Sequence, residues 1–112
     1  MALLREYKEI AYQWGIWKTE ESPEELLALL PDPERYEQQL TLFSSPHRKL
    51  EWLSVRILLY QLLGEEKTIE YAPSGKPHLA DSSYFISISH TRGYVAVILS
   101  PVSEVGIDIE QY

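Results

Sequence analysis

The chain has 112 residues, 45% of them hydrophobic, and a formal net charge of −7. Its size and composition predict a single domain over residues 1–112. The acidic balance argues against nucleic acid as a partner, because binding a polyanion needs a basic surface. The lack of cysteine excludes disulfides and thiolate metal sites. No apolar run approaches the ~20 residues of a membrane span, and no targeting segment begins the chain. We therefore expect a cytoplasmic protein with no membrane partner.

The first half of the chain predicts one strand and three helices. Residues 8–18 carry apolar side chains at alternate positions, as a half-buried strand does; they are Ile10, Tyr12, Trp14 and Ile16. Each helix is expected to begin at a polar residue followed by proline; these pairs are Ser22-Pro23, Asp32-Pro33 and Ser45-Pro46. The third helix is the longest, and Gly64 stands where a C-terminal glycine would end it.

The second half of the chain predicts short strands. They are expected over residues 68–71, 84–90, 94–100 and 105–109, and turn residues such as those at 73–77 separate them. The predicted fold class is therefore α+β, with one strand and three helices before a mainly antiparallel sheet.

Two acids stand near the C-terminus. On a strand, Asp108 and Glu110 would share one face, and the apolar Val105, Ile107 and Ile109 would share the other. Paired carboxylates repel each other unless a hard cation such as Mg²⁺ neutralises them, so the pattern favours half of a metal site. The alternative is a solvated strand face that ends in ordinary acidic residues.

The start of the third helix carries His47, Arg48 and Lys49, where the first two helices carry glutamates. A cation near a helix N-terminus costs about 0.3–1 kcal/mol when it is exposed to solvent. A phosphate bound by backbone N–H groups and by Arg48 would offset this cost. The alternative is that Glu51 or another acid pairs with Arg48 and the remaining charges face water.

Two further stretches suggest phosphate contacts. Lys76 stands at the centre of a Gly-Lys-Pro turn, where it could act as a point charge, although exposed turn lysines are common. On the strand over residues 84–90, Phe85, Ser87 and Ser89 would face one way and Ile86, Ile88 and His90 the other. A histidine beside a phosphate is readily charged, but a histidine at a strand end often only binds a carbonyl.

Taken in order, these motifs resemble the N-terminal half of the 4′-phosphopantetheinyl transferases of the surfactin-synthetase-activating type. The resemblance covers roughly residues 30 to 110 and rests on Arg48, Gly75-Lys76-Pro77, Ile88-Ser89-His90-Thr91 and Gly106-Ile107-Asp108-Ile109-Glu110. It implies a holo-acyl-carrier-protein synthase type of activity. Such enzymes move the phosphopantetheine arm of coenzyme A to a serine of an apo acyl or peptidyl carrier protein and release 3′,5′-ADP.

The resemblance also implies roles for single residues. Asp108 and Glu110 resemble the catalytic Mg²⁺ ligands that bind the pyrophosphate of coenzyme A. Lys76, Ser89 and His90 resemble phosphate contacts, with Arg48 on the side of the 3′-phosphate; these four are the expected residues for binding coenzyme A. Arg35 falls loosely where some relatives have a base.

The family's third metal ligand and a nearby lysine lie in a Trp-x-x-Lys-Glu motif, which is absent from this sequence. We therefore expect the N-terminal lobe of a two-lobed enzyme, with little transferase activity on its own. Its expected partners are coenzyme A, the carrier protein, and a missing C-terminal lobe or a second copy. The alternatives are a non-catalytic lobe that binds a partner protein, or a generic phosphate-binding module.

Overall fold

The computed structural model describes residues 3–8 and 12–109, with the side chains described from Lys8 onward. The strands are β1 Leu3–Lys8, β2 Gln13–Lys18, β3 Ile69–Tyr71, β4 Pro77–Leu79, β5 Phe85–Thr91 and β6 Tyr94–Ser100. The helices are α1 Pro23–Ala28, α2 Glu34–Leu40 and α3 Pro46–Leu63. This is the α+β class that the sequence predicts. None of the described helices combines the length and the apolar composition that a membrane span requires.

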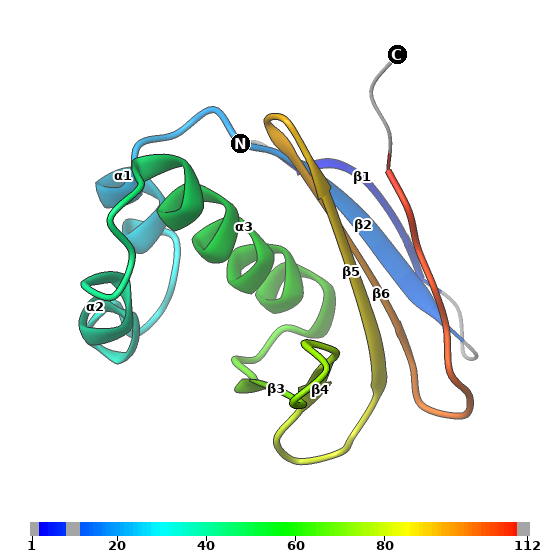
Figure 1. Ribbon diagram of the computed structural model, residues 1–112. Coiled ribbons are helices and arrows are strands. Elements are labelled where there is room, and N and C mark those ends of the chain that lie inside the picture. The colour runs from blue at the N-terminus through cyan, green and yellow to red at the C-terminus, as the bar shows by residue number, and fades with distance from the viewer. Residues whose placement is uncertain (1–2, 9–11, 110–112) are drawn as a thin grey trace.

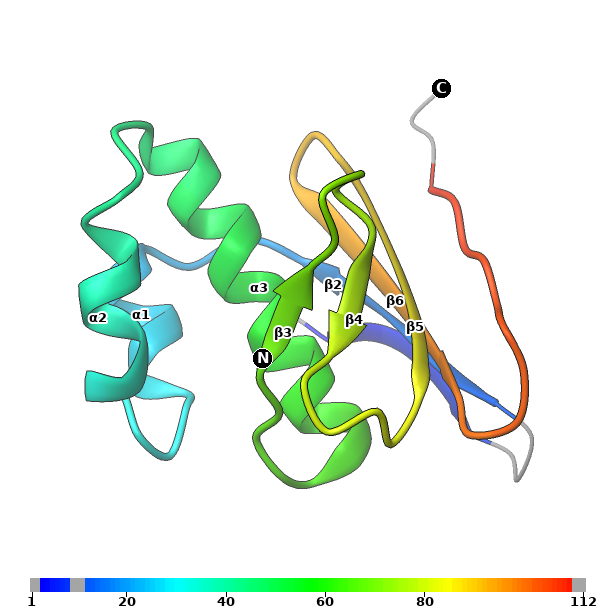
Figure 2. The same ribbon diagram turned by 60° about the horizontal axis from the view of Figure 1, so that its bottom comes forward.

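The larger sheet is antiparallel throughout and has the strand order β1-β2-β6-β5 within the described residues. The strands β3 and β4 form a separate hairpin. Helix α3 lies across one face of the sheet, and α1 and α2 lie on the far side of α3 (Figure 1). In Figure 2 the β3–β4 hairpin stands between α3 and the edge strand β5. The hairpin therefore closes one side of the space between helix and sheet.

The hydrophobic core lies between α3 and the sheet. Buried side chains of α3 meet buried side chains of β2 and β6, among them Trp17, Leu53, Ile57, Leu58, Val97 and Leu99. Helix α3 is buried along most of its length from Leu53 to Leu62, because α1 covers the side that faces away from the sheet. This packing fixes the position of α3 relative to β5, the two elements that carry Arg48 and His90.

Local signals set the ends of α1 and α3 as predicted. Before α1, the Ser22 hydroxyl accepts from the Glu25 N–H at 3.3 Å, and Glu25 Oε1 accepts from the Ser22 N–H at 3.1 Å. Before α3, Ser45 occupies the N-cap position. The prediction was wrong for α2, whose N-cap is Pro33 without a side-chain cap. That helix begins one residue later than expected, so Asp32 stands outside it.

Gly64 ends α3 with a φ of +72° and donates its N–H to the Tyr60 carbonyl at 2.8 Å. We expect Gly64→Ala to lower the free energy of unfolding by about 1–2 kcal/mol, because a Cβ is unfavourable in the left-handed region. No atom would contact that Cβ within 4 Å, so the cost is conformational. Urea unfolding measures it. Gly106→Ala is the matched control, because its surroundings are equally open and its φ is not positive; equal losses in both variants would contradict the prediction.

The first strand differs from the prediction in its bounds and in its phase. Strand β2 begins at Gln13, and Trp17 is fully buried while Trp14 and Ile16 are only half-buried. Apolar side chains stand on both faces of this strand, so an alternating period could not decide which face is inward. Ile10 lies outside the described residues. The additional strand β1 pairs with β2 and was not predicted.

Residues 105–109 do not form the predicted strand. The segment lies along the outer face of β5, where the Ile107 N–H donates to Ser87 Oγ at 3.3 Å and the Ile109 N–H donates to Ser89 Oγ at 3.1 Å. Because its partners are serine side chains, no backbone ladder forms. The expected alternation remains, since Ile107 and Ile109 are half-buried and Asp108 is exposed.

Candidate functional site

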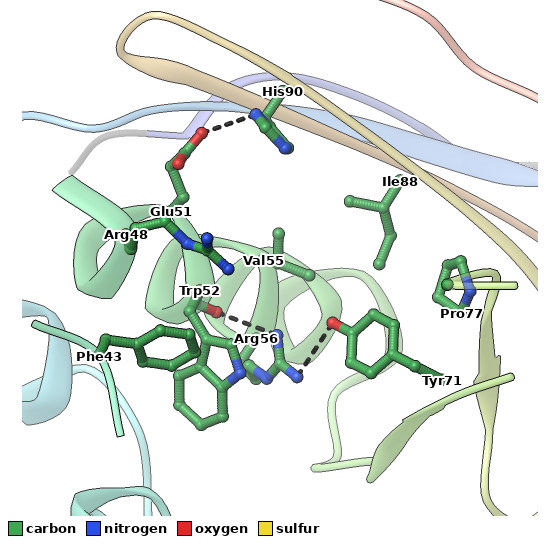
Figure 3. Close-up of a pocket in the computed structure, with 11 residues that line it drawn as sticks. Phe43, Arg48, Glu51, Trp52, Val55, Arg56, Tyr71, Pro77, Ile88 and His90 are labelled. Carbon is green, nitrogen blue, oxygen red and sulfur yellow. Dashed lines mark hydrogen bonds and ion pairs between the residues drawn. The ribbon is translucent and has the colours of Figure 1, made fainter. Parts of the chain in front are cut away.

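A pocket of about 640 Å³ opens between the first half of α3, the β3–β4 hairpin and the end of β5 (Figure 3). Its lining residues are Phe43, Arg48, Glu51, Trp52, Val55, Arg56, Tyr71, Gly75, Pro77, Ile88 and His90. The volume falls in the range of small-molecule sites. The lining combines aromatic rings with three side chains that can carry positive charge, which suits a ligand with a flat group and anionic groups.

Arg56 is a buried cation of this pocket, with 7% of its surface exposed. Its Nη1 donates to the Trp52 carbonyl and its Nη2 to the Tyr71 hydroxyl, both at 3.3 Å. The guanidinium lies 4.0 Å from the centroid of the Trp52 ring. Burial lowers the pKa of Arg56. No carboxylate of the described residues forms an ion pair with it, so its positive charge is available to an anion.

Arg48 lies two turns before Arg56 on the same face of α3 and points into the pocket (Figure 3). Its guanidinium lies 5.5 Å from the centroid of the Phe43 ring. Within the described part of the chain no acid pairs with this guanidinium, because Glu51 interacts with two histidines instead. The sequence left two interpretations of Arg48: it binds a phosphate, or it pairs with Glu51 or another acid. The described residues do not contain the pairing with Glu51.

His90 stands near the end of β5, on the face that the sequence predicts. Ile86 is buried, Ile88 packs against the core, and His90 reaches α3. The His90 Nδ1 lies 2.6 Å from Glu51 Oε2, while the other carboxylate oxygen lies 3.6 Å from His47 Nε2. The structure thus brings two of the predicted residues, Arg48 and His90, into one pocket.

Lys76 lies apart from them. Its Nζ forms an ion pair with Glu104 Oε1 at 2.9 Å, and both side chains are exposed. This contact lowers the pKa of the Glu104 carboxyl. Lys76 and Glu104 line a smaller cleft of about 270 Å³, whereas the neighbours of Lys76, Gly75 and Pro77, line the larger pocket. The turn therefore contributes Gly75 and Pro77 to the pocket, while the Lys76 side chain contacts Glu104.

Ser89 and Asp108 lie on the opposite face of the sheet from the pocket. The Ser89 hydroxyl donates to Asp108 Oδ1 at 3.1 Å. Both ribbon views show the sheet between α3 and the segment that carries Asp108 (Figures 1 and 2). Glu110 lies outside the described residues. Among residues 3–8 and 12–109 no group of at least three histidine or acidic side chains is arranged to hold a metal ion, so the Mg²⁺ site stays a prediction.

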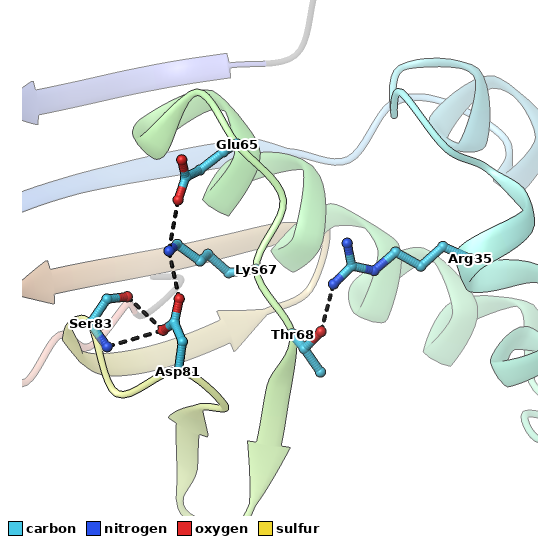
Figure 4. Close-up of polar contacts among 6 residues, drawn as sticks. All are labelled: Arg35, Glu65, Lys67, Thr68, Asp81 and Ser83. Carbon is cyan, nitrogen blue, oxygen red and sulfur yellow. Dashed lines mark hydrogen bonds and ion pairs between the residues drawn. The ribbon is translucent and has the colours of Figure 1, made fainter.

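Ion pairs connect the segments before and after the β3–β4 hairpin, which carries Tyr71 and Pro77 (Figure 4). Lys67 Nζ, just before β3, lies 2.7 Å from Glu65 Oε1 and 2.6 Å from Asp81 Oδ2, just after β4. Hydrogen bonds from Lys67 and Ser83 hold the pKa of Asp81 below its usual range, and the two acids raise the pKa of Lys67. These contacts join the two ends of the hairpin, before β3 and after β4.

Arg35 takes part in a structural contact outside the pocket. Its Nη1 lies 3.0 Å from Glu66 Oε2. Its Nη2 donates to the Thr68 hydroxyl at 2.5 Å, as Figure 4 shows. The same Glu66 carboxylate accepts from the Asp32 N–H at 3.2 Å. Arg35 therefore joins α2 to the segment before β3. Its contacts do not suggest that it acts as a base, the role that the resemblance loosely implied.

Sequence reasoning missed Arg56, Trp52, Phe43 and Tyr71 as pocket residues. A signal for Arg56 existed, because Arg48, Trp52 and Arg56 follow each other at four-residue steps on one helix. A single cation inside an apolar stripe indicates either a buried pair or a ligand site. No comparable signal places Tyr71, which reaches the pocket only through the fold of the hairpin.

Curated relatives with a stated function match part of the chain. The 4′-phosphopantetheinyl transferase AcpT of Salmonella typhi and that of Salmonella typhimurium are each 36% identical to it over 64 residues. AcpT of Escherichia coli strain K12 is 38% identical over 64 residues. Each match covers 56% of this chain and 33% of the relative, so the chain spans about a third of the length of these proteins. No protein-family model matches the chain.

Proposed function

Because 56% of the chain is related to 4′-phosphopantetheinyl transferases, as its motifs predicted, we propose that it takes part in phosphopantetheine transfer. The substrate is coenzyme A, and the acceptor is a serine of an apo acyl or peptidyl carrier protein. In this proposal the pocket beside α3 holds phosphate groups of coenzyme A. The observation that carries it is the convergence of Arg48, Arg56 and His90 on one pocket of a chain with these relatives.

The charge arrangement of the pocket supports a phosphate ligand. Arg48 and Arg56 have no acidic partner among the described residues. Guanidinium groups bind phosphate through two donors at once, and these bonds are strongest where water is excluded. Burial of Arg56 provides such a place.

The second part of the proposal concerns the face that carries Asp108. Strand β5 is an edge strand within the described sheet. In this proposal the diphosphate of coenzyme A leaves the pocket beside His90 and passes around this edge. It then reaches Ser89 and Asp108 on the opposite face of the sheet. Mg²⁺ keeps several waters and is held by one or two carboxylates together with substrate phosphates. Asp108 is exposed and fits this mode, with Glu110 as the proposed second ligand. The ion would neutralise phosphate charge during transfer.

We also infer that the chain acts as the N-terminal lobe of a two-lobed enzyme. The match covers only 33% of each relative, as expected for a chain that forms part of such an enzyme. The third metal ligand and the base would then come from a C-terminal lobe or from a second copy. A cytoplasmic location stays a prediction from the sequence.

Nuclear magnetic resonance titration with coenzyme A tests the proposal. We expect Mg²⁺-dependent shifts of the backbone amides of Lys76, Ser89, His90 and Asp108, together with the guanidinium signal of Arg56. The dependence on Mg²⁺ follows because the metal joins the diphosphate to Asp108. Asp32→Asn removes an acid that does not line the pocket and is the control, which should leave all these shifts unchanged.

Other outcomes would replace the proposal by one of the two alternatives. The absence of any shift with coenzyme A would favour a lobe that binds a partner protein. Equal responses to coenzyme A, inorganic phosphate and unrelated nucleotides would favour a generic phosphate-binding module. Either result contradicts the transferase role.

A further inference from the structure

We propose that Glu51 is a positioning residue, which holds His90 so that its second ring nitrogen donates to a phosphate in the pocket. This inference deepens the proposed function, because it concerns the same pocket. Glu51 itself carries the wrong charge to bind a phosphate, and it lies among the cations of the pocket lining. Its contacts explain why an acid stands there.

The contact between Glu51 and His90 is short and links two distant elements. Glu51 Oε2 lies 2.6 Å from His90 Nδ1, and the two residues belong to α3 and β5. The Glu51 side chain is 20% exposed, whereas that of His90 is 59% exposed. The imidazole therefore has a partly shielded side that faces the acid and an open side that faces the pocket. Figure 3 shows the other ring nitrogen directed toward the pocket.

A carboxylate at Nδ1 determines what Nε2 can do. A neutral imidazole has one donor and one acceptor, whereas an imidazolium has two donors. The Glu51 carboxylate accepts a hydrogen bond from Nδ1–H, which leaves Nε2 directed toward the ligand. A phosphate at Nε2 places an anion at each ring nitrogen, and in that complex the ring carries both protons and Nε2 donates to a phosphate oxygen. A glutamine amide in place of this carboxylate would still accept a hydrogen bond, but it would supply no charge.

Repulsion between Glu51 and the phosphate is limited by the way the carboxylate is held. One of its oxygens contacts His90, and the other lies 3.6 Å from His47 Nε2. Both carboxylate oxygens of Glu51 are therefore directed toward histidine side chains. Arg48 and Arg56, which do not pair with it, remain for the ligand.

Calorimetric titration of coenzyme A into the full chain and its variants tests the inference. We expect Glu51→Gln to weaken binding about tenfold, because a charge-assisted hydrogen bond to phosphate becomes a neutral one. The same substitution made in a His90→Gln chain should then have less than a twofold effect, because Glu51 acts through His90. His47→Gln removes only the longer contact of Glu51 and is the matched control, with an expected change below twofold.

Tighter binding by Glu51→Gln, or an equal loss with and without His90, would overturn the inference. A second readout does not need coenzyme A. Nitrogen-15 spectra of His90 in the ligand-free chain should show a proton on Nδ1 in the wild type, and a different distribution of protons over the two ring nitrogens in Glu51→Gln. An unchanged His90 spectrum overturns the positioning role. A changed spectrum without coenzyme A binding upholds the contact and rejects the proposed function.

Discussion

Arg56→Met is expected to bind coenzyme A about 10- to 100-fold more weakly than the wild type. A hydrogen bond to a charged group contributes about 1.5–3 kcal/mol, and each 1.4 kcal/mol changes affinity tenfold. Arg56 is the most buried cation of the pocket, so little water competes for its donors. Methionine fills much of the same volume without the charge.

The same substitution should change the free energy of unfolding by less than about 1 kcal/mol. Removing a buried cation that has only neutral partners relieves its desolvation cost. This gain offsets the lost contact with the Trp52 ring and the two hydrogen bonds of the guanidinium. The substitution would therefore weaken coenzyme A binding without a comparable loss of stability, as expected for a residue whose role is to bind a ligand.

Arg35→Met is the matched control for Arg56→Met. It also replaces an arginine by methionine, but Arg35 pairs with Glu66 outside the pocket. Its affinity for coenzyme A should stay within twofold of the wild type. Calorimetry gives the affinities, and urea unfolding gives the stabilities. Equal losses of affinity in both variants would contradict a specific role of Arg56.

Trp17→Ala is expected to lower the free energy of unfolding by about 3–5 kcal/mol, a large part of the total stability of a small domain. Trp17 is fully buried in the core between α3 and the sheet. Truncation removes its apolar surface and leaves a cavity that the surrounding strands and helix cannot fill. Urea unfolding followed by circular dichroism measures the loss.

Trp17→Phe should cost clearly less than Trp17→Ala. Phenylalanine keeps most of the aromatic surface, and it also removes an indole N–H that has no hydrogen-bond partner among the described residues. A buried donor without a partner destabilises the fold, so its loss partly compensates for the smaller ring. A phenylalanine variant as unstable as the alanine variant, or an alanine variant within 1 kcal/mol of the wild type, would contradict this account of the core.

Features that depend on neighbouring residues could be predicted from the sequence. The Ser22 capping box, the Ser45 N-cap and the C-terminal Gly64 each lie within one turn of the helix end that they determine. Strand β5 was predicted with its correct faces, because Ile86 and Ile88 alternate with polar serines.

Features that depend on the whole fold could not be predicted. The phase of β2 was ambiguous because Trp14, Ile16 and Trp17 place apolar surface on both faces. Residues 105–109 have the alternation of a strand, yet the serine hydroxyls of β5 take the place of a backbone partner. Local pattern does not contain this information, because it depends on which surface the segment meets.

The candidate site could likewise be predicted from the sequence only in part. Arg48 and His90 were predicted separately and lie in one pocket, whereas Lys76 faces Glu104. Asp108 contacts Ser89 across the sheet from that pocket. The motifs indicated residue types suited to phosphate, but only the arrangement of α3, β5 and the hairpin shows which of them share a cavity.

A crystal structure of the chain with coenzyme A and Mg²⁺ tests the central claim most directly. The account predicts phosphate oxygens within hydrogen-bond distance of the Arg48 and Arg56 guanidinium groups and of His90 Nε2. Coenzyme A bound at another surface, with the pocket beside α3 filled only by solvent, would contradict it.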